Sequence, residues 1–569
     1  MSTIRKLLFL LLLQTALWSQ TISIQNISQN IQSMIQTQST GKYKNYLKFL
    51  YQQNGYTPLW VGENHTVKMS QLINALQNPL YNYKNKPLNQ HKIKSLLYQL
   101  DNGAFNPNQE LQSYAKLDVL LSKSFIELAV FMVEGDVDWN LVQKKLHALK
   151  GSDDISSHWE MKPKRFASIR SLASAAIKGN INTYLESLIP MQERYYKLIK
   201  LLKKYRVMYT FPKITYSSRT LKLGSRSNNI ENIKKRLKIS GEYPRNASTS
   251  TKFNKDLQRA IKRFQKRYLL KVTGEIDKTT TYYLNQPANK HIQAIITNLD
   301  KTKLYPKNFA QEHIEVNIPD FNLRYYRNAE KIMKMAVVVG RIDRPTPLFS
   351  NNISYMVLNP TWTIPDNLIK RDLIHVLREN PSYLEENNIH VFSGKREIQV
   401  QQSKLDPFEK SKRRVPYRFV QFPGENNALG RVKFMFPNKY AVYLHDTDNK
   451  SLFSRRYRIY SSGCMRVQEP FKLLETLLEH SRGSYSQGDL DDIFETNKPT
   501  TIRLTRRIPV HILYFTVYEE DGLAYFKHDI YMYDKIIEES VAGNRKSTFH
   551  IPKNRMVTVK KKSAKPLSN

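Results

Sequence analysis

The spacing of apolar residues changes along this chain, and the change limits what the chain can fold into. From about residue 23 to residue 206, apolar side chains recur every three or four positions, as in Leu121, Phe125 and Leu128, which is typical of amphipathic helices. From about His291 onward the apolar runs are short and β-rich, with Gly, Pro and Asn between them. Because a single hydrophobic core does not extend over 569 residues, we expect three or more domains, helical first and mainly β afterwards.

Turn residues and shifts in composition predict where these domains begin and end. We expect a multidomain α+β protein with a helical N-terminal scaffold, a small three-helix module and a mainly β domain. A charged stretch between strands predicts a helical lid insertion, and the basic C-terminus predicts a flexible tail. The expected ranges are 1–20 for a signal peptide, 23–210 for the scaffold, 217–287 for the module, 291–540 for the β domain with its insertion at about 366–414, and 541–569 for the tail.

Residues 1–20 have the pattern of a secretory signal peptide. Basic residues precede an apolar run from Leu7 to Leu13, and a small residue near Ser19 allows cleavage. An uncleaved N-terminal anchor is the alternative, since Leu17 suits the −3 position of a cleavage site poorly. We therefore expect an exported protein that works in the periplasm, within the cell envelope.

The chain has a large positive charge, with 89 Lys and Arg against 49 Asp and Glu and a net charge of +40. Such a field attracts nucleic acid, an anionic membrane surface or an acidic cell-wall polymer. Export, the lack of a recognisable nucleic-acid motif and the scatter of the basic residues argue against nucleic acid. Peripheral contact with an anionic membrane surface stays open. The 13 His residues show no spacing of paired metal ligands, so we expect no metal and no cofactor.

The single cysteine, Cys464, is the residue from which a function is most readily argued. An exported chain with one Cys has no intrachain disulfide, so its thiol is unpaired. A buried inert Cys is one interpretation. The other is a thiolate nucleophile, whose proton His445 can take if the chain turns back beside it. Gly463 leaves room for a substrate carbonyl, and the N–H groups of Gly463 and Cys464 can donate to an oxyanion.

A helical stretch before the β domain contains a recognisable pair of motifs. They stand as Ala260-Ile-Lys-Arg-Phe264-Gln265 and Gly274-Glu-Ile-Asp277, after a start at Leu223-Gly224. These motifs resemble the peptidoglycan-binding-domain-1 module, a small three-helix fold. An unrelated helical bundle is the alternative, because Phe and Gln at such spacing are common core residues. Residues 243–251 depart from the pattern of that module.

The motif at the cysteine is Ser461-Ser462-Gly463-Cys464-Met465-Arg466, after a strand that ends at His445. It resembles the YkuD-type L,D-transpeptidase catalytic domain, with Ser462 in place of that family's usual second His. The Ser-Ser-Gly-Cys form resembles the larger YcbB-like branch, which has an N-terminal scaffold and an inserted peptidoglycan-binding module. The resemblance covers most of the chain, because further segments are similar in order: 359–365, 430–438, 508–516 and 529–534.

The resemblance implies roles for individual residues. Cys464 is the nucleophile, and His445 is its base or thiolate partner. Arg466 organises the site or meets a substrate carboxylate, with a structural ion pair as the alternative. Substrate contacts are implied for four more residues, each with a structural alternative as a turn hydroxyl or a core aromatic: Ser461, Ser462, Tyr443 and Trp362.

The reaction that the resemblance implies is acyl transfer between peptidoglycan stems. Cys464 attacks the carbonyl of the third residue of a tetrapeptide and expels the terminal D-alanine, and a neighbouring stem amine then resolves the thioester into a 3→3 cross-link. Water as acceptor would make the chain an L,D-carboxypeptidase, and a non-catalytic peptidoglycan-binding protein is the alternative of another class. The implied partners are peptidoglycan stem peptides and glycan, and carbapenem-type inhibitors, whose β-lactam carbonyl should acylate Cys464.

Overall fold

The computed structural model describes residues 23–38, 41–62, 66–149, 158–166, 168–208 and 211–541. The predicted signal peptide (1–20) and all but the first residue of the predicted tail (541–569) lie outside these ranges. The chain divides into two compact units: unit 1 comprises residues 1–137, 162–211 and 286–308, and unit 2 comprises residues 138–161, 212–285 and 309–569. Every helix in the described ranges is too short or too polar to cross a membrane.

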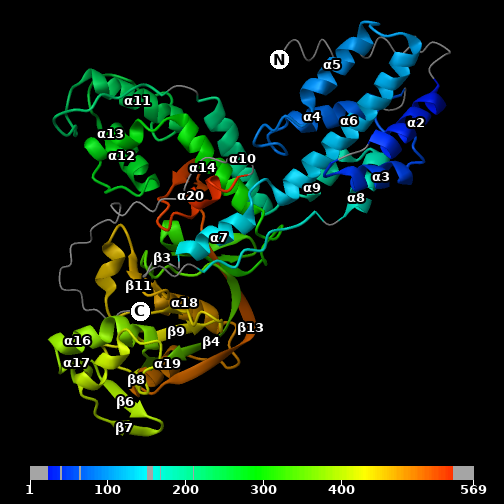
Figure 1. Ribbon diagram of the computed structural model, residues 1–569. Coiled ribbons are helices and arrows are strands. Elements are labelled where there is room, and N and C mark those ends of the chain that lie inside the picture. The colour runs from blue at the N-terminus through cyan, green and yellow to red at the C-terminus, as the bar shows by residue number, and fades with distance from the viewer. Residues whose placement is uncertain are drawn as a thin grey trace. The chain divides into compact units, whose positions relative to one another are not determined.

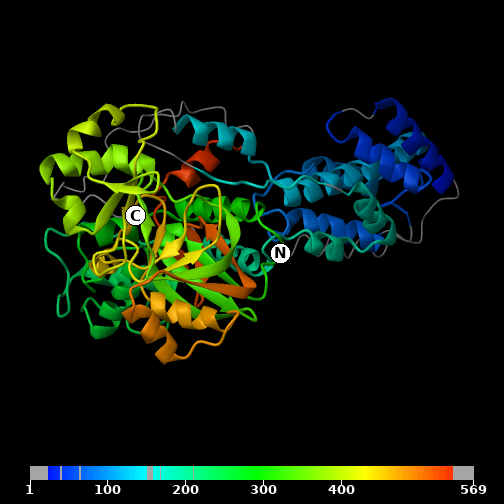
Figure 2. The same cartoon turned by 90° about the horizontal axis from the view of Figure 1, so that it is seen from below.

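Unit 1 is a bundle of helices, drawn mostly in blue and cyan in Figures 1 and 2. Its longest helix, α6, begins at a capping box formed by Asn106 and Gln109. The buried Asp118 of α6 accepts hydrogen bonds from Tyr51 Oη (2.6 Å) and from the N–H of Trp60 (2.7 Å), so its carboxylate is satisfied inside the bundle. The helices are α2 (Ile24–Ser33), η1 (Met34–Gln38), α3 (Lys44–Gln53), α4 (Thr66–Gln77), α5 (Gln90–Asp101), α6 (Pro107–Glu134), α8 (Ile169–Lys178), α9 (Ile181–Ser187), α10 (Gln192–Arg206) and α14 (Ala288–Thr302).

The helix α14 shows that the change from helix to strand comes later than the expected position near His291. Residues 288–302 are helical, and the first strand begins at His313. Ile295 and Leu299 are fully buried and four residues apart, so they share one helical face. This face belongs to unit 1, where α14 packs with α10.

Three helices in unit 2 form the predicted small module: α11 (Asn228–Ser240), α12 (Lys255–Arg267) and α13 (Lys278–Leu284). Gly241 ends α11 in the left-handed conformation (φ 96°), which favours glycine. The side chain of Gln265 fastens the turn at Gly274: its Oε1 accepts the Gly274 N–H (2.9 Å), and its Nε2 donates to the Glu275 carbonyl (2.8 Å). The side-chain amide of Gln265 therefore connects the Phe264-Gln265 motif of α12 to the motif that begins at Gly274.

The module packs against a hairpin of the β domain, formed by β14 (Val517–Glu520) and β15 (Leu523–Phe526). The rings of Tyr268 and Phe526 stack with their centroids 5.5 Å apart. Arg267, which is 1 % exposed, donates to the Ala524 carbonyl and forms an ion pair with the fully buried Glu242. A buried cation is tolerated here because a carboxylate and a carbonyl both accept from it.

We expect Glu242→Ala to weaken the fold of the module by about 3–5 kcal/mol, because it leaves the Arg267 charge buried without its carboxylate. Hydrogen exchange of α11 and α12 in the full chain, at increasing urea, measures this loss. Asp256→Ala is the matched control. It breaks the exposed pair with Arg259 in the same module and should cost less than about 1 kcal/mol. Equal losses in the two variants would contradict the buried-pair interpretation.

The rest of unit 2 is built on a nine-stranded sheet in the order β11-β3-β12-β10-β9-β4-β13-β1-β2. Because β2 also pairs with β3, the strands from β3 to β2 close into a ring, so no strand within the ring is an edge strand. The strand β11 lies outside the ring and pairs with β3. The mainly β domain expected from the sequence is thereby confirmed. The strands are β1 (His313–Asn317), β2 (Asn322–Arg327), β3 (Glu330–Gly340), β4 (Ser350–Leu358), β9 (Val432–Met435), β10 (Leu444–His445), β11 (Ile459–Ser461), β12 (Met465–Val467) and β13 (Thr500–Leu513), with helices α7 (Trp139–Leu149), α18 (Pro470–Leu478), α19 (Gln487–Glu495) and α20 (Tyr533–Glu538) beside them.

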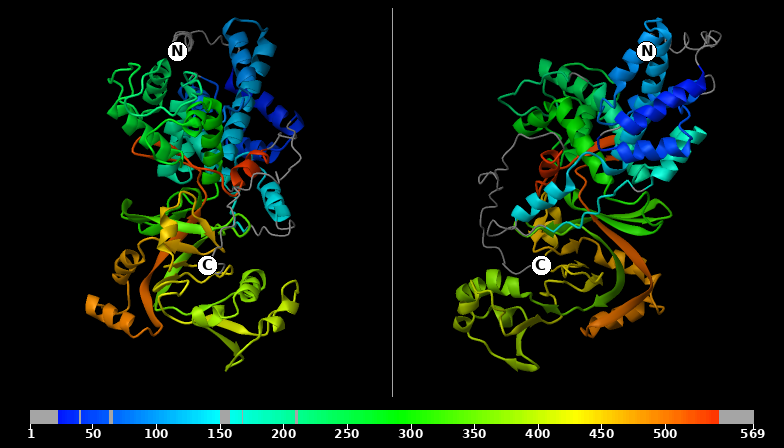
Figure 3. Two further views of the ribbon diagram at one scale, coloured as in Figure 1. Left: turned by 90° about the vertical axis from the view of Figure 1, so that its left-hand side faces the viewer. Right: turned by 45° about the vertical axis from the view of Figure 1, so that its right-hand side comes forward.

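The insertion that the sequence predicts to be helical contains a sheet as well as helices (Figure 3). Its four strands are ordered β5-β8-β6-β7, and Gly394 (φ 62°) turns the β6–β7 hairpin. The alternation of buried Ile389 and Val391 marks β6 as a half-buried strand within the charged stretch. The elements are β5 (Trp362–Thr363), α15 (Asp366–Leu368), η3 (Ile369–Leu373), α16 (Ile374–Glu379), α17 (Tyr383–Glu386), β6 (Ile389–Ser393), β7 (Arg396–Ile398), η4 (Gln402–Lys404), η5 (Asp406–Phe408), β8 (Arg418–Gln421) and, in the loop after His445, η6 (Lys450–Ser454).

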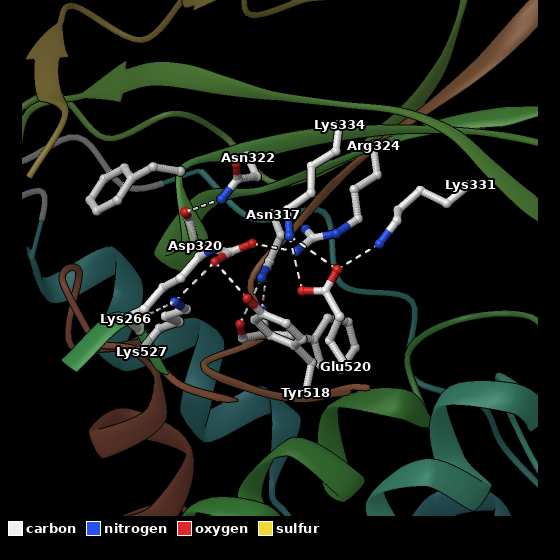
Figure 4. A network of polar contacts seen from close by, with 12 residues as sticks. Lys266, Asn317, Asp320, Asn322, Arg324, Lys331, Lys334, Tyr518, Glu520 and Lys527 are labelled. Atoms are coloured by element: carbon white, nitrogen blue, oxygen red, sulfur yellow. Dashed lines mark hydrogen bonds and ion pairs between the residues drawn. The ribbon is translucent and has the colours of Figure 1, made fainter. Parts of the chain in front are cut away.

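A buried polar network ties the β14–β15 hairpin to the first strands of the sheet (Figure 4). Asp320, between β1 and β2, pairs with Arg324 (2.5 Å) and Lys527 (3.3 Å) and accepts from Tyr518 Oη (2.7 Å). Burial alone would raise the pKa of Asp320, but the two cations lower it well below its usual range. The hairpin against which the module packs is therefore held to the sheet by charged hydrogen bonds.

Candidate active site

The registers of three neighbouring strands put the chemically active side chains on one face of the sheet. The strand β10 pairs with β12 in parallel, with His445 opposite Arg466, and with β9 in antiparallel, with His445 opposite Lys433. Successive side chains alternate between faces, so Tyr443 and Cys464, two residues earlier on the two parallel chains, share this face. The other face presents buried apolar side chains, among them Leu444, Met465 and Phe434.

The thiol of Cys464 is almost enclosed. The residue is 4 % exposed, and its Sγ lies 3.9 Å from the Ala441 carbonyl oxygen. Burial raises the pKa of the thiol to about 12, although the positive charges of Arg466 and Lys433 act in the opposite direction. In this conformation the thiol is protonated at neutral pH, and attack on a carbonyl requires a base and a better hydrated site.

The imidazole of His445 is fully buried, with its ring centroid 5.6 Å from that of Tyr443. Burial, assisted by the charge of Arg466, lowers the pKa of His445 to about 3. A backbone hydrogen bond from Asp446 acts on the ring and raises its pKa, but this effect is smaller than that of burial. The ring is therefore neutral near pH 7, and one of its nitrogens has a lone pair that can accept a proton.

The buried Arg466 and the partly buried Lys433 make this face electropositive. Burial lowers the pKa of Arg466 to about 10, while Asp448 and Cys464 raise it. Burial also lowers the pKa of Lys433, whose Nζ donates to the Thr361 carbonyl (3.4 Å) and lies 5.8 Å from the ring centroid of Tyr443. Positive charge at these positions stabilises a thiolate, and equally an oxyanion formed beside it.

The turn before Cys464 is held together by Ser461. The Ser461 Oγ donates to the Cys464 carbonyl (2.5 Å) and accepts the Gly463 N–H (3.2 Å), so Ser461 is a turn hydroxyl. Gly463 has φ 126°, a conformation that favours glycine. Its N–H, expected from the sequence to donate to an oxyanion, is used inside the turn in this conformation.

A second clamp fixes the same turn to the end of β3. The Thr346 Oγ1 donates to the Gly463 carbonyl (2.9 Å) and accepts the Gly340 N–H (2.9 Å). The Tyr531 Oη donates to the Gly340 carbonyl (2.6 Å). A Cβ on Gly340 would lie 2.2 Å from the Arg344 carbonyl oxygen, so the loop after β3 passes too close for any other residue.

The remaining predicted substrate residues are placed differently from one another. The Ser462 Oγ accepts a hydrogen bond from Arg344 Nη1 (3.2 Å). Trp362 is 2 % exposed in the hydrophobic core of the insertion, and Tyr443 packs against that core from the catalytic face. The structure thus brings Tyr443 to the thiol and makes Trp362 a core residue, whose indole N–H lacks a partner among the described residues.

This domain matches a known family over most of its length. Residues 311–502 match the model of the L,D-transpeptidase catalytic domain, YkuD, and the matched range includes His445 and Cys464. Residues 45–202 match the model of a scaffold domain, and residues 226–284 match the one described as "Putative peptidoglycan binding domain". The YcbB-like order of scaffold, module and catalytic domain, expected from the sequence, is confirmed.

A protein of Haemophilus influenzae named "Putative L,D-transpeptidase" is 33% identical over 245 residues, which are 43% of this chain and 49% of that protein. The chain thus spans about half the length of this curated relative. An L,D-transpeptidase structure from Stackebrandtia nassauensis is 13% identical, with 54% of this chain and 99% of that chain covered and a TM-score of 0.21. The structure of the Ldtfm–avibactam carbamoyl enzyme is 9% identical, with 65% and 98% covered and a TM-score of 0.17. TM-scores this low do not establish a detailed structural match.

Several residues at the catalytic face were not anticipated from the sequence. Lys433 alternates with buried Val432 and Phe434, and that alternation is a signal that could have placed it opposite the core. Arg344 and Thr346 lie in an Arg-Pro-Thr-Pro loop with no marked pattern. The described residues contain no cluster of three or more His, Cys, Asp or Glu that could hold a metal ion.

The buried imidazole predicts a pH-dependent stability of the catalytic domain. Because the pKa of His445 falls from 6.5 in the unfolded chain to about 3 in the folded one, only the unfolded chain binds a proton between these values. Stability should therefore fall as pH drops from 6.5 towards 3, by up to about 1.4 kcal/mol per pH unit from this residue. We would measure the free energy of unfolding by urea at several pH values from 4 to 7. It should change less steeply with pH in His445→Gln than in the unmutated chain.

Cys464→Ala is the matched control for that measurement. This variant keeps the buried imidazole. The thiol that it loses has a pKa near 12 and does not titrate between pH 4 and pH 7. The free energy of unfolding should therefore depend on pH as it does in the unmutated chain. Parallel slopes for His445→Gln and Cys464→Ala would show that His445 is not the group responsible.

Proposed function

We propose that this chain is a peptidoglycan L,D-transpeptidase with Cys464 as its nucleophile. The main support is the register of β10 and β12, which puts Cys464, His445 and Arg466 on one face of a domain of this family. The peptidoglycan-binding match in the same chain supports a cell-wall substrate, with stem peptides at the catalytic domain and glycan at the module.

The proposed chemistry has two acyl-transfer steps. His445 takes the thiol proton, and the Sγ of Cys464 attacks the carbonyl carbon of the third stem residue. The tetrahedral oxyanion is stabilised by the positive charge of Arg466 and Lys433. The C–N bond breaks, the D-alanine amine takes a proton and leaves, and a thioester remains. The side-chain amine of a second stem attacks the thioester, which restores the thiol and forms the 3→3 cross-link.

Two alternatives use the same features differently. With water in place of the amine, the second step makes the chain an L,D-carboxypeptidase. A non-catalytic peptidoglycan-binding protein is the alternative favoured by one observation, namely that Cys464 is 4 % exposed and its thiol pKa lies near 12. We favour the enzyme because the strand registers bring an imidazole and two cations to the same face as Cys464.

Intact-mass analysis of the purified chain with disaccharide-tetrapeptides tests the nucleophile. The unmutated chain should form a thioester adduct and release D-alanine, while Cys464→Ala should form none. His445→Ala should form the adduct at least about 100-fold more slowly, which is the usual contribution of a general base. Carbapenems should add their full mass to the same cysteine. Dimeric product would assign transpeptidation, and tripeptide alone would assign carboxypeptidation.

The enzyme proposal fails if the unmutated chain stays unmodified by both reagents and binds peptidoglycan as tightly as Cys464→Ala does. Export to the periplasm and contact with an anionic membrane surface stay predictions from the sequence. Cell fractionation, with and without residues 1–20, decides the first of them.

A further inference from the structure

Arg344 connects the insertion to the turn that holds the nucleophile. Its guanidinium forms a two-point ion pair with Asp372 of η3, with Nη1–Oδ2 at 2.5 Å and Nη2–Oδ1 at 3.0 Å. The same Nη1 donates to Ser462 Oγ at 3.2 Å, two residues before Cys464. The two charged side chains are only 9 % and 14 % exposed, so this pair is largely removed from solvent.

The backbone of Arg344 is held by contacts within the catalytic domain. Its loop leaves β3 at Gly340, where the backbone approaches too closely for a Cβ. The Arg344 N–H bonds back to the Arg341 carbonyl (3.1 Å), and Thr346 binds the Gly463 carbonyl (2.9 Å). The backbone of Arg344 is therefore tied to the catalytic domain beside the nucleophile's turn, whereas Asp372 belongs to the insertion.

A substrate cannot reach Cys464 while that residue is 4 % exposed. The insertion meets the catalytic face through its packing on Tyr443 and through Asp372, so access requires these contacts to loosen. Loosening them separates Asp372 from Arg344, so the guanidinium loses both of its short Nη contacts to a carboxylate and keeps the longer contact of Nε with Asp343 Oδ2 (3.7 Å). Losing those contacts is costly in a poorly hydrated place. A substrate carboxylate offers the same two oxygens in the same fork geometry.

We propose that Arg344 is a specificity-determining residue that binds a carboxylate of the incoming acyl donor, and that Asp372 occupies this position when the insertion is closed. The proposal rests on the proposed function for its substrate, a stem peptide whose leaving D-alanine ends in a carboxylate. When the insertion opens, the carboxylate of the acyl donor replaces that of Asp372 on Arg344. Opening is therefore favourable only when an anionic donor is present. The insertion thus acts as a latch that an acidic substrate releases.

Alkylation of Cys464 tests the latch without any peptidoglycan substrate, because the chain contains no other cysteine. Neutral iodoacetamide reports access to the thiol, and anionic iodoacetate reports access together with carboxylate binding. Asp372→Asn should raise the rate of alkylation by iodoacetamide about tenfold or more. This is the change expected if the variant loses about 1.4 kcal/mol of the free energy that favours the closed insertion. It should also raise the iodoacetate-to-iodoacetamide rate ratio, because Arg344 is then available to the carboxylate.

Arg344→Gln separates the two parts of the proposal. It should raise the iodoacetamide rate as Asp372→Asn does. Its iodoacetate-to-iodoacetamide rate ratio should, however, be about fivefold to tenfold smaller than that of Asp372→Asn. Asp406→Asn is the matched control, since it breaks an ion pair with Arg378 that lies within the insertion, and both rates should stay at the unmutated level. Unchanged rates in Asp372→Asn would overturn the latch, and equal ratios in the two variants would overturn the carboxylate site.

A second assay connects Arg344 to the substrate. With stem tetrapeptides ending in a carboxylate or in a carboxamide, the unmutated chain should prefer the acid in kcat/KM, and Arg344→Gln should lose that preference with little change on the amide. If the alkylation results hold and neither peptide is turned over, the latch stands and the proposed enzyme function fails. If both peptides react and Arg344→Gln keeps the preference, the enzyme function stands and the assignment of Arg344 fails.

Discussion

The parallel pairing of β10 with β12 is the interaction on which the candidate site depends. It places His445 opposite Arg466 and brings Cys464 onto the same face. A slip of one residue would turn Leu444 or Met465 onto that face and direct the active side chains into the apolar core. Both strands are interior in the sheet, with β9 on one side and β3 on the other, and the ring closure through β2 and β3 leaves little freedom for such a slip.

Burial then sets the charge state of the site. It raises the pKa of the Cys464 thiol to about 12 and lowers that of the His445 imidazole to about 3, so both groups are neutral in this conformation. The cations Arg466 and Lys433 favour the thiolate, but their effect is smaller than the cost of desolvation. Access and ionisation are therefore coupled, because the same opening that admits a substrate also hydrates the thiol and reduces its pKa.

The module and the catalytic segment meet at a shared histidine within unit 2. The Nε2 of His528 lies 3.0 Å from Tyr283 Oη of α13, and its Nδ1 lies 2.7 Å from Tyr457 Oη. Tyr457 belongs to the segment between His445 and Cys464, and the Asp320 network holds the hairpin that precedes His528. The module is thus connected through the His528 side chain to the segment that returns to the nucleophile.

The sequence by itself determined the features that depend on local spacing. These are the helical scaffold, the three helices of the module with the Phe264-Gln265 and Gly274 motifs, the mainly β domain, and Cys464 with His445 as the residues of chemical interest. Only the tertiary structure decided which of these residues meet. The strands inside the insertion, the Lys433 cation, the engaged N–H of Gly463 and the Arg344–Asp372 pair all arise from contacts between segments distant in the chain. Such contacts are selected by the packing of the whole fold, which no local pattern of residues specifies.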